Sequence, residues 1–328
     1  MNNPSTFLLL NLPMLAIKEV LSEITPLDLI NFSMISRKTR LIARHFSKQP
    51  PISKYDIILN IYEPHGVQIF HGENLYEYEI VSYKPEDGLR VENEIIKQSK
   101  YSEDPVTEFK NYVEYAIEVF DWPVDQLYFY FHDLNDTSYS IIDWLKLRVR
   151  STDLCSMSLF SDQISDDYVS YFLENVEVRR YLTLGCTMSD NFQLTIPRSV
   201  ERLEITKSAF VTFDQLSSFN CVSIHLSQTS ISNKELNQFF KNWMASKSNQ
   251  KLQDLFIGIK DLESLETIFD LPHEVIDPGT VRTMHRLNHP FPVAGGIDIK
   301  RDDGAVATCY TQFGIGSLYL AMLVHLNF

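Results

Sequence analysis

The side chains that most often carry out chemistry in proteins form no catalytic or metal-binding pattern in this chain. His285 and His289 stand four residues apart, the spacing that places two zinc ligands on one face of a helix. No glutamate follows as in the zinc motif His-Glu-x-x-His, and Pro290 would end a helix at this point. Gly314 and Gly316 lack the third glycine of a dinucleotide-binding loop. We therefore predict no metal site and no cofactor.

The cysteine, serine and histidine residues form no nucleophile motif either. Cys155, Cys186, Cys221 and Cys309 are widely spaced and include no Cys-x-x-Cys pair, which is typical of a protein from a reducing compartment. The chain contains no Gly-x-Ser-x-Gly elbow. We expect no catalysis. A hydrolase whose Ser or Cys meets a His only in the folded chain is left open as an alternative.

The composition is that of a folded, acidic protein. Of 328 residues, 44% are hydrophobic and 22% are charged, which is within the globular range. The net charge of −14 repels a nucleic-acid backbone, so we predict no nucleic-acid partner. The most apolar segment, Ser317–Val324, is too short to cross a membrane and is predicted to be a buried strand. We expect a soluble protein of the cytoplasm or nucleus, without a signal peptide or membrane contact.

Residues 1–50 are basic, whereas the rest of the chain is acidic. Pro13 and Pro26 suit the first turns of two short helices, Thr25 can cap the second, and a third helix follows. Because about forty residues cannot enclose all of their apolar side chains, we expect some of these to stay exposed for a partner. The set comprises Leu12, Ile17, Leu21, Leu27, Leu29, Ile30, Phe32, Met34, Ile35, Leu41 and Ile42.

The order Leu-Pro at 12–13, Pro-x-x-Leu at 26–29 and a basic stretch at 36–40 is similar to that of the F-box. The resemblance implies a small helical module that binds the Skp-type adaptor of a cullin-based SCF ubiquitin ligase. Leu15 stands where many F-boxes have an acidic residue, and a generic helical subdomain is the alternative. By resemblance, the adaptor contacts are Leu12, Pro13, Leu15, Ile17, Val20, Leu21, Pro26, Leu29, Ile30 and Phe32.

Residues 51–125 are predicted to form a β-rich, acidic linking or capping region after a linker at Pro50 and Pro51. Alternating apolar and polar residues within 55–83 predict a β-hairpin. Acids such as Glu77 and Glu79 crowd residues 73–121, where we expect a solvated face. The sequence leaves open whether this region is a separate domain or the cap of the repeats that follow.

From residue 127 onward a strand-like unit returns repeatedly, in several cases followed by a helical segment. The apolar pairs of these units are Leu127/Phe129, Met157/Leu159, Leu182/Leu184, Leu203/Ile205, Ile224/Leu226 and Leu255/Ile257. This order is typical of leucine-rich repeats. We therefore predict an α/β chain in which the three-helix F-box of residues 1–50 and the linking region precede an irregular, leucine-rich-repeat-like strand/helix solenoid at 126–328, with a C-terminal β-hairpin. An ordinary mixed α/β layer is the alternative.

A second resemblance lies within the repeat region. The sequences Ser-Val-Glu-Arg-Leu-Glu-Ile at 199–205 and Ile-Ser-Asn-Lys-Glu-Leu-Asn-x-Phe-Phe-Lys-Asn-Trp at 231–243 are similar to the type 2 F-box-associated domain of nematode F-box proteins. The closing hairpin at 296–308 resembles the end of that domain. The resemblance implies a substrate-binding role for residues 126–328. Asn233 is predicted to cap the helix at 233–244, and Trp243 is predicted to pack in the core.

If the repeats stack, the residues between the apolar pairs line the face of the sheet that carries no helices. Aromatic residues suit binding hot spots, and Glu204 with the negative net charge favours a basic or neutral protein target. Plain solvent-exposed surface is the alternative. The candidate target contacts are Tyr128, Tyr130, Ser158, Thr183, Glu204, Ser223, His225 and Phe256.

These patterns and resemblances predict a non-catalytic substrate-recognition subunit of an SCF-type ubiquitin ligase. The F-box would hold the Skp-type adaptor and through it a cullin, and the C-terminal region would hold an unknown protein target. Ubiquitin transfer would belong to other subunits. The alternative is a repeat-type protein-interaction scaffold that never joins a ligase.

Overall fold

The computed structural model describes residues 9–48, 55–84, 87–92, 95–121, 123–131, 134–286, 289–314 and 316–325. The chain divides into two compact units, unit 1 (Met1–Tyr128) and unit 2 (Phe129–Phe328). The division into three domains remains a prediction.

Unit 1 begins with short helices, as the proline pattern predicts. After the turn η1 (Leu9–Asn11), these are α1 (Met14–Ser22), α2 (Pro26–Met34) and α3 (Arg37–Ser47). Thr25 caps α2, because its hydroxyl oxygen accepts a hydrogen bond from the Asp28 N–H at 3.1 Å. Ser36 and Thr39 form a capping box at the start of α3. The three predicted helices and the Thr25 cap are confirmed.

A five-stranded sheet follows in unit 1. Its strands are, in spatial order, β1 (Asp56–Ile61), β2 (His65–His71), β3 (Asn74–Val81), β5 (Ile95–Tyr101) and β4 (Gly88–Glu92). The first three strands are antiparallel, which confirms the predicted hairpin and adds a strand to it. Helix α4 (Pro105–Phe120) packs against β2 and β3, and the Tyr112 ring stacks on Tyr78 at a centroid distance of 3.8 Å. The predicted linker at Pro50 and Pro51 lies outside the described residues.

Two acids of this sheet do not belong to a solvated face, contrary to the prediction. Glu77 and Glu79 are only 8% and 7% exposed. Being two positions apart on β3, they point to the same side and share one cation of β5. The Lys97 ammonium lies 3.4 Å from Glu77 Oε2 and 2.7 Å from Glu79 Oε1. This pairing compensates the loss of hydration that burial imposes on both carboxylates.

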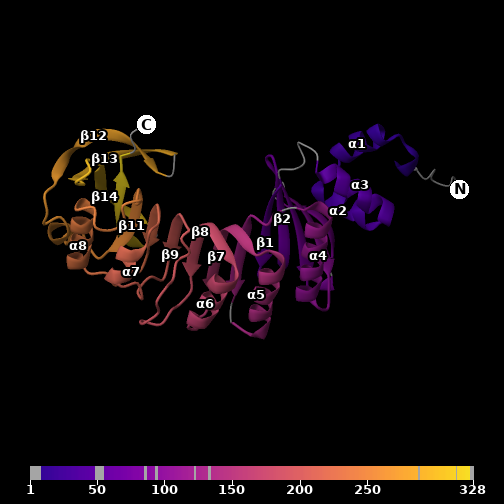
Figure 1. The fold of residues 1–328 in the computed structure, drawn as a ribbon, viewed down its shortest axis with the longest axis horizontal. Coiled ribbons are helices and arrows are strands. Elements are labelled where there is room, and N and C mark those ends of the chain that lie inside the picture. The colour runs from indigo at the N-terminus through magenta and orange to yellow at the C-terminus, as the bar shows by residue number, and fades with distance from the viewer. Residues whose placement is uncertain are drawn as a thin grey trace. The chain divides into compact units, whose positions relative to one another are not determined.

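Strands and helices alternate through the first part of unit 2 (Figure 1). Strand β6 (Gln126–Phe131) comes first along the chain and belongs to unit 2 from Phe129 on. The parallel strands that follow are β7 (Ser151–Leu159), β8 (Glu177–Gly185), β9 (Arg202–Ile205), β10 (Ser223–Leu226) and β11 (Asp254–Ile259). The helices are α5 (Asp136–Arg148), α6 (Asp166–Asn175), α7 (Phe213–Ser218), α8 (Asn233–Met244) and α9 (Ser264–Ile268). Helices α5 to α8 lie on one face of the sheet (Figure 1), and the opposite face is called the open face.

The apolar pairs that predicted these strands are buried in the core. Every residue of the pairs is at most 3% exposed, with Leu159 the most exposed. The residues between them, such as Thr183 and His225, are only half-buried and belong to the open face. The predicted alternation of strands and helices is confirmed as a mixed α/β arrangement, whereas the leucine-rich-repeat-like solenoid remains a prediction.

Antiparallel strands complete the sheet of unit 2. These are β12 (Glu274–Arg286), β13 (His289–Lys300), β14 (Val306–Gly314) and β15 (Ser317–Val324), in the spatial order β12-β13-β14-β15-β11. The predicted hairpin at 296–308 is the turn between β13 and β14, and the predicted buried strand at 317–324 is β15. Strand β15 therefore lies between β14 and β11, although it comes last along the chain. Among the described residues, none of the helices is long and apolar enough to cross a lipid bilayer.

The cap of α8 is one residue earlier than predicted. Ser232, not Asn233, is the N-cap, and it forms a capping box with Glu235. The reason is positional, because Asn233 already has helical geometry as the first residue of α8. Trp243 is fully buried, as predicted.

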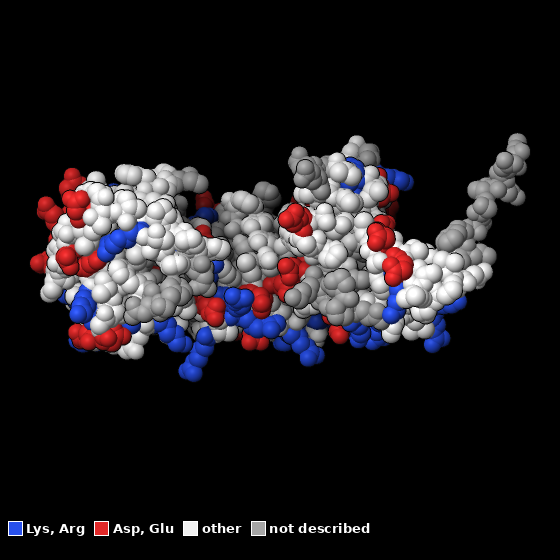
Figure 2. Space-filling view, turned by 90° about the horizontal axis from the view of Figure 1, so that it is seen from above, with Lys and Arg blue, Asp and Glu red and all other residues white. Residues whose placement is uncertain are grey.

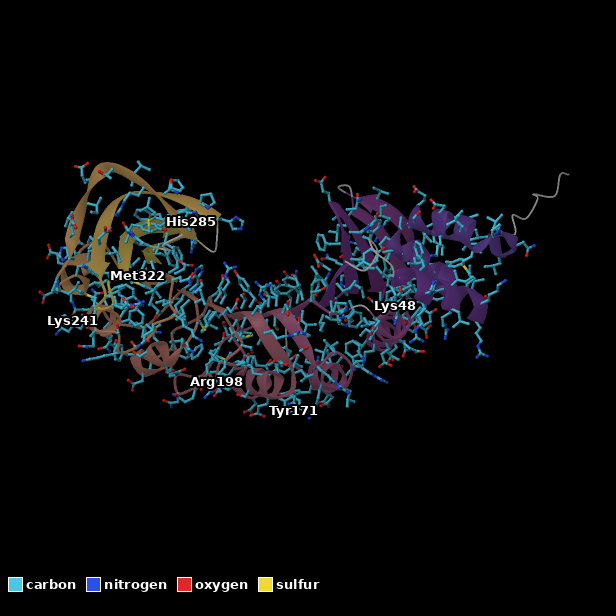
Figure 3. The ribbon with its side chains drawn as sticks, turned by 45° about the horizontal axis from the view of Figure 1, so that its top comes forward. Lys48, Tyr171, Arg198, Lys241, His285 and Met322 are labelled. Atoms are coloured by element: carbon cyan, nitrogen blue, oxygen red, sulfur yellow. The ribbon has the colours of Figure 1, made fainter. Side chains whose placement is uncertain are left out.

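The outer part of the β12–β13 hairpin folds back over the open face. We call residues 281–286 and 289–294 the arm. In Figure 3, His285 is labelled on the arm and Met322 is labelled on β15 beneath it. The register of β12 and β13 shifts between Ile276 and Val281, and Gly295 and Gly296 have φ values of 62° and 112°, which side-chain-bearing residues rarely adopt. These two features bend the hairpin at the base of the arm.

Candidate protein-interaction sites

The residues expected to bind an adaptor divide into a buried and an accessible group. The buried members are Ile17, Leu21, Pro26, Leu29 and Ile30. They hold the helices together, so they shape the surface of unit 1 rather than form it. Leu15 is 71% exposed and Val20 is 37% exposed, Pro13 is also exposed, and Leu12 and Phe32 are half-buried. Whether any of them contacts an adaptor remains a prediction.

Further apolar side chains of these helices reach the surface. Met14, Met34, Ile35 and Leu41 are 53%, 46%, 73% and 60% exposed. In Figure 2 the surface of helices α1 to α3, at the right of the view, is mostly white, with basic side chains along its lower edge. The expected apolar surplus is confirmed. None of these four residues is among the adaptor contacts expected from the F-box resemblance. Met34, Ile35 and Leu41 do belong to the apolar side chains that about forty residues were expected to leave exposed.

The rest of unit 1 holds this helical surface in place. Ile30 of α2 faces a small apolar space bounded by β1, β2 and α4, with Leu59 and Val113 among its walls. The Ser33 and Tyr115 hydroxyls lie 2.8 Å apart, which links α2 to α4. The Arg40 guanidinium lies 4.9 Å from the centre of the Tyr115 ring. The helices thus share a core with the sheet and α4.

The structure brings most of the predicted target contacts together on the open face. Thr183, Glu204, His225 and Phe256 are direct neighbours across β8, β9, β10 and β11. Ser158 pairs with Gly185, and the Tyr130 hydroxyl lies 3.5 Å from that of Ser156. Tyr128 is the last residue of unit 1, where its hydroxyl donates a hydrogen bond to Gln126.

A cluster of charged and polar groups occupies the open face beneath the arm. Asp254 Oδ2 lies 2.7 Å from His225 Nε2, accepts a hydrogen bond from the Ser223 hydroxyl at 2.9 Å, and accepts one from Arg286 Nε at 3.4 Å. Arg286 also lies over the Phe256 ring, 5.1 Å from its centre. Two predicted target contacts, His225 and Phe256, therefore already contact a residue of the chain's own arm, and a third, Ser223, is engaged by Asp254.

The Asp254 carboxylate is buried, with 2% of its side chain exposed. Burial acts to raise its pKa, but the hydrogen bond from His225, the charges of His225 and Arg286, and the Ser223 hydroxyl outweigh this effect. The pKa of Asp254 is therefore held below its ordinary value. The carboxylate stays ionised and anchors the arm through Arg286.

Sequence reasoning missed Asp254, Arg286 and a stacked pair beside them. Arg202 lies over the Tyr181 ring at 4.0 Å, one row along the same strands. Asp254 and Tyr181 could have been found, since they lie two positions before Phe256 and Thr183 and so share the open face. Nothing in the local pattern points to Arg286, which reaches the cluster from a distant strand.

The cluster does not activate a nucleophile. Ser223 and His225 contact the same oxygen of Asp254, whereas a catalytic triad needs the histidine between the serine and the carboxylate. The four cysteines are free and buried, and burial raises the pKa of each thiol. A raised pKa disfavours the reactive thiolate.

The two histidines that suggested a zinc pattern do not share a helix. His285 lies on β12 and His289 on β13, in neighbouring pairs of the hairpin. No three His, Cys, Asp or Glu side chains in the described part of the chain are grouped so that they could hold a metal ion.

Comparison with known proteins finds two family matches. The F-box domain matches residues 9–48, which include the helices α1 to α3, and the family described as F-box associated matches residues 191–257, which include β9, α7, β10 and α8. Neither match is to an enzyme family. No solved structure matches the chain.

One curated relative is the uncharacterized protein F59B2.8 of Caenorhabditis elegans. It is 24% identical over 159 residues, which make up 46% of this chain and 36% of that protein. The match therefore spans about a third of the relative's length. An F-box match at residues 9–48 followed by an F-box associated match at residues 191–257 fits the pattern of a nematode-type F-box protein, as the resemblance of its sequence predicts.

Proposed function

We propose that this protein is the substrate-recognition subunit of an SCF-type ubiquitin ligase that works in the cytoplasm or nucleus. The observation that carries the proposal is the pair of family matches, one at residues 9–48 and one at residues 191–257. The F-box would bind a Skp-type adaptor, and through it a cullin. Unit 2 would bind a protein target through its leucine-rich-repeat-like sheet.

The mechanism is tethering rather than bond chemistry. Holding the adaptor and the target on one chain raises the effective concentration of target lysines near the ubiquitin-loaded enzyme of the complex. The exposed apolar side chains of the helices in unit 1, such as Leu15 and Ile35, support an adaptor contact, since apolar surface of this kind is common where partners bind.

The part of the open face that the arm leaves uncontacted is the proposed target surface. Thr183 and Glu204 lie side by side there, and Tyr130 and Ser158 belong to the same face. Tyrosine supplies binding area at a low cost in side-chain entropy, and Glu204 favours a basic or neutral target. His225 and Phe256 would contribute only indirectly, through their contacts with Arg286, and Ser223 would contribute through its hydrogen bond to Asp254.

A binding assay with purified Skp-type adaptor tests the proposal. Leu15→Arg places a basic charge, where many F-boxes have an acidic one, on a side chain that is 71% exposed, so folding is expected to survive. Loss of a central apolar contact should weaken adaptor binding by about 2 kcal/mol, roughly thirtyfold. Buried residues such as Leu21 are poor test positions, because their loss would disturb the helices themselves.

The matched control is Leu147→Arg on α5, where the side chain is 68% exposed. It should leave adaptor binding unchanged, and circular dichroism should show equal folding of both variants. If the intact chain binds no adaptor at tens of micromolar, or if Leu15→Arg binds as well as the control, the ligase role fails. A protein-interaction scaffold outside the ligase would then be favoured.

A further inference from the structure

One edge of β14 is unpaired along half of its length. On the β15 side, pairing runs along the strand to Gly314 and Ser317. On the β13 side, pairing ends at Ile297 and Cys309. Among the described residues, no strand pairs with this side of residues 310–314. We call this stretch the free edge.

The free edge exists because β13 turns away from the sheet. Gly296, with its φ of 112°, packs so closely that a Cβ atom there would lie 2.8 Å from the Cys309 carbonyl oxygen. Beyond this point the arm is held over the open face, because Arg282 donates to Asp298 at 2.7 and 2.9 Å and Arg286 reaches Asp254. Strand β13 cannot pair further with β14 while these contacts hold.

The direction of the backbone groups on β14 follows from hydrogen bonds at its start. The Ala305 carbonyl accepts from the Arg301 N–H on the β13 side, and the Val306 carbonyl accepts from the His325 N–H on the β15 side. Successive residues of an antiparallel strand alternate in this respect. Thr311 and Phe313 therefore direct their N–H and C=O groups to the free edge.

Residues 310–312 of the free edge line a groove with a volume of about 480 Å³. One wall is the arm at residues 291–294, and another is formed by Leu265 of α9 and by Phe269 directly after it. No lining residue is charged: they are Leu265, Phe269, Val275, Ile276, Pro278, Phe291, Pro292, Val293, Ala294, Gly296, Ile297, Cys309, Tyr310, Thr311, Gln312 and Leu320. Within the described residues, the Tyr310 hydroxyl and Gln312 Oε1 are buried without a hydrogen-bond partner.

The usual protection of a strand edge is missing here. Proteins block such edges with charged side chains, proline or a bulge. Residues 310–314 are Tyr, Thr, Gln, Phe and Gly, and Phe313 is 77% exposed. An uncharged edge with an exposed aromatic ring is a template for another strand.

We propose that the groove binds an extended, uncharged segment of a partner protein, which adds as a strand to the free edge of β14. Backbone pairing would come from Thr311 and Phe313, and alternate apolar side chains of the segment would enter the uncharged groove. The lack of charge in the lining excludes acidic and basic segments, since a charged side chain would lose hydration without gaining a partner there.

A second copy of this chain fits the groove less well. Its own free edge is bordered by the same arm and α9 residues, whereas a free extended segment brings no such walls with it. The idea that the segment belongs to a ligase target rests on the proposed function. The idea that the groove binds an extended peptide does not depend on that function.

The first test uses synthetic octapeptides in which Thr alternates with Val, Leu, Phe or Met, each labelled with fluorescein. Anisotropy with the full-length chain should show saturable binding of at least one of them. Two forms of that peptide are then made, one N-methylated at its odd-numbered amides and one at its even-numbered amides. Because alternate amides of a strand face opposite sides, the two forms distinguish backbone pairing from nonspecific hydrophobic binding. One form should bind at least tenfold more weakly, and the other should bind nearly as well as the parent.

The second test changes the protein. Phe313→Pro removes an N–H of the free edge and leaves the β15 side intact, and it should weaken peptide binding at least tenfold. Phe313→Ala removes the ring but keeps the N–H, and it should retain most of the binding. Hydrogen exchange in the wild-type chain should slow at the Thr311 and Phe313 amides when peptide is added.

The proposal is overturned if none of the peptides binds at millimolar concentration, or if both N-methylated forms bind alike. It is also overturned if light scattering shows that the wild-type chain dimerises and Phe313→Pro does not, because the edge then serves self-association. Adaptor binding is measured on the wild-type chain and on Phe313→Pro, and the two should bind the adaptor equally. If the wild-type chain binds peptide but no adaptor, the ligase role fails and the groove remains a peptide site.

Discussion

His65 is a titratable side chain placed where it cannot easily take up a proton. It lies on β2, is 5% exposed, and its ring centre is 5.6 Å from that of Phe109 on α4. Its Nδ1 has no hydrogen-bond partner among the described residues. Burial lowers its pKa below the ordinary value, nearby Glu63 acts to raise the pKa, and Lys110 lowers it further.

This depressed pKa predicts that unit 1 is acid-sensitive. The unfolded chain binds a proton on His65 near pH 6.5, whereas the folded chain binds it only at lower pH. The stabilisation is therefore complete above pH 6.5 and is lost as the pH falls toward the folded-state pKa. Urea midpoints measured from pH 7.5 to 5 should decline in the wild type and decline less in His65→Leu. Equal slopes in the two proteins would show that His65 is not responsible.

Single residues were predictable from the sequence where a regular period fixes their direction. Alternation identified both the buried pair Leu182 and Leu184 and the open-face residue Thr183 between them. It could not identify the partners of His225, because Arg286 reaches it from a strand 61 residues away. It also could not separate Leu15 from Leu21, since short helices expose or bury an apolar side chain according to what packs against them.

The arm is an element whose position depends on two arginines and a bend. Arg282 and Arg286 lie on the same side of β12, and Met284 between them packs against Val293 and Leu323. Charge pairing thus flanks an apolar contact. The sequence predicted strands here, but the fold-back depends on Gly295, Gly296 and contacts between distant strands, which no local pattern encodes.

Removing Arg286 should loosen the arm and destabilise unit 2. In Arg286→Ala the Asp254 carboxylate stays buried and loses a cation, which should lower the free energy of unfolding by about 2 kcal/mol, since Arg286 is itself partly exposed. Urea denaturation of the full chain measures this change.

The Arg286→Ala, Asp254→Asn double variant tests the cause. Without the carboxylate charge, loss of the arginine should matter less. The double variant should therefore lose less free energy of unfolding than the two single variants lose in total. Strict additivity would mean that the charge pair does not hold the arm.

At the scale of the whole molecule, the F-box helices depend on the rest of unit 1. Ile30 is fully buried, and its neighbours Leu59 and Val113 belong to β1 and α4. The sequence placed a domain boundary near residue 50 because charge and composition change there. Such changes report surface character, whereas the extent of a core is set by contacts between segments that only the folded chain reveals.

We therefore predict that a fragment of residues 9–48 is largely unfolded alone. Its inward apolar side chains would face water, and isolated helices of this length are marginal. Circular dichroism should show little helix in this fragment. A fragment of residues 9–128 should show the helix content that α1 to α4 require. Strong helicity in the short fragment would mean that the F-box folds independently.

The position of β15 in the sheet has a consequence for biosynthesis. The ribosome makes β11 first, then β12, β13 and β14, and only afterwards β15, the strand that separates β11 from β14. The nascent chain therefore presents a bare β11 border while these segments are translated. A stop codon or stalled ribosome just before β15 would release a chain whose sheet cannot close. Late truncations should thus be cleared by cellular quality control as readily as early ones.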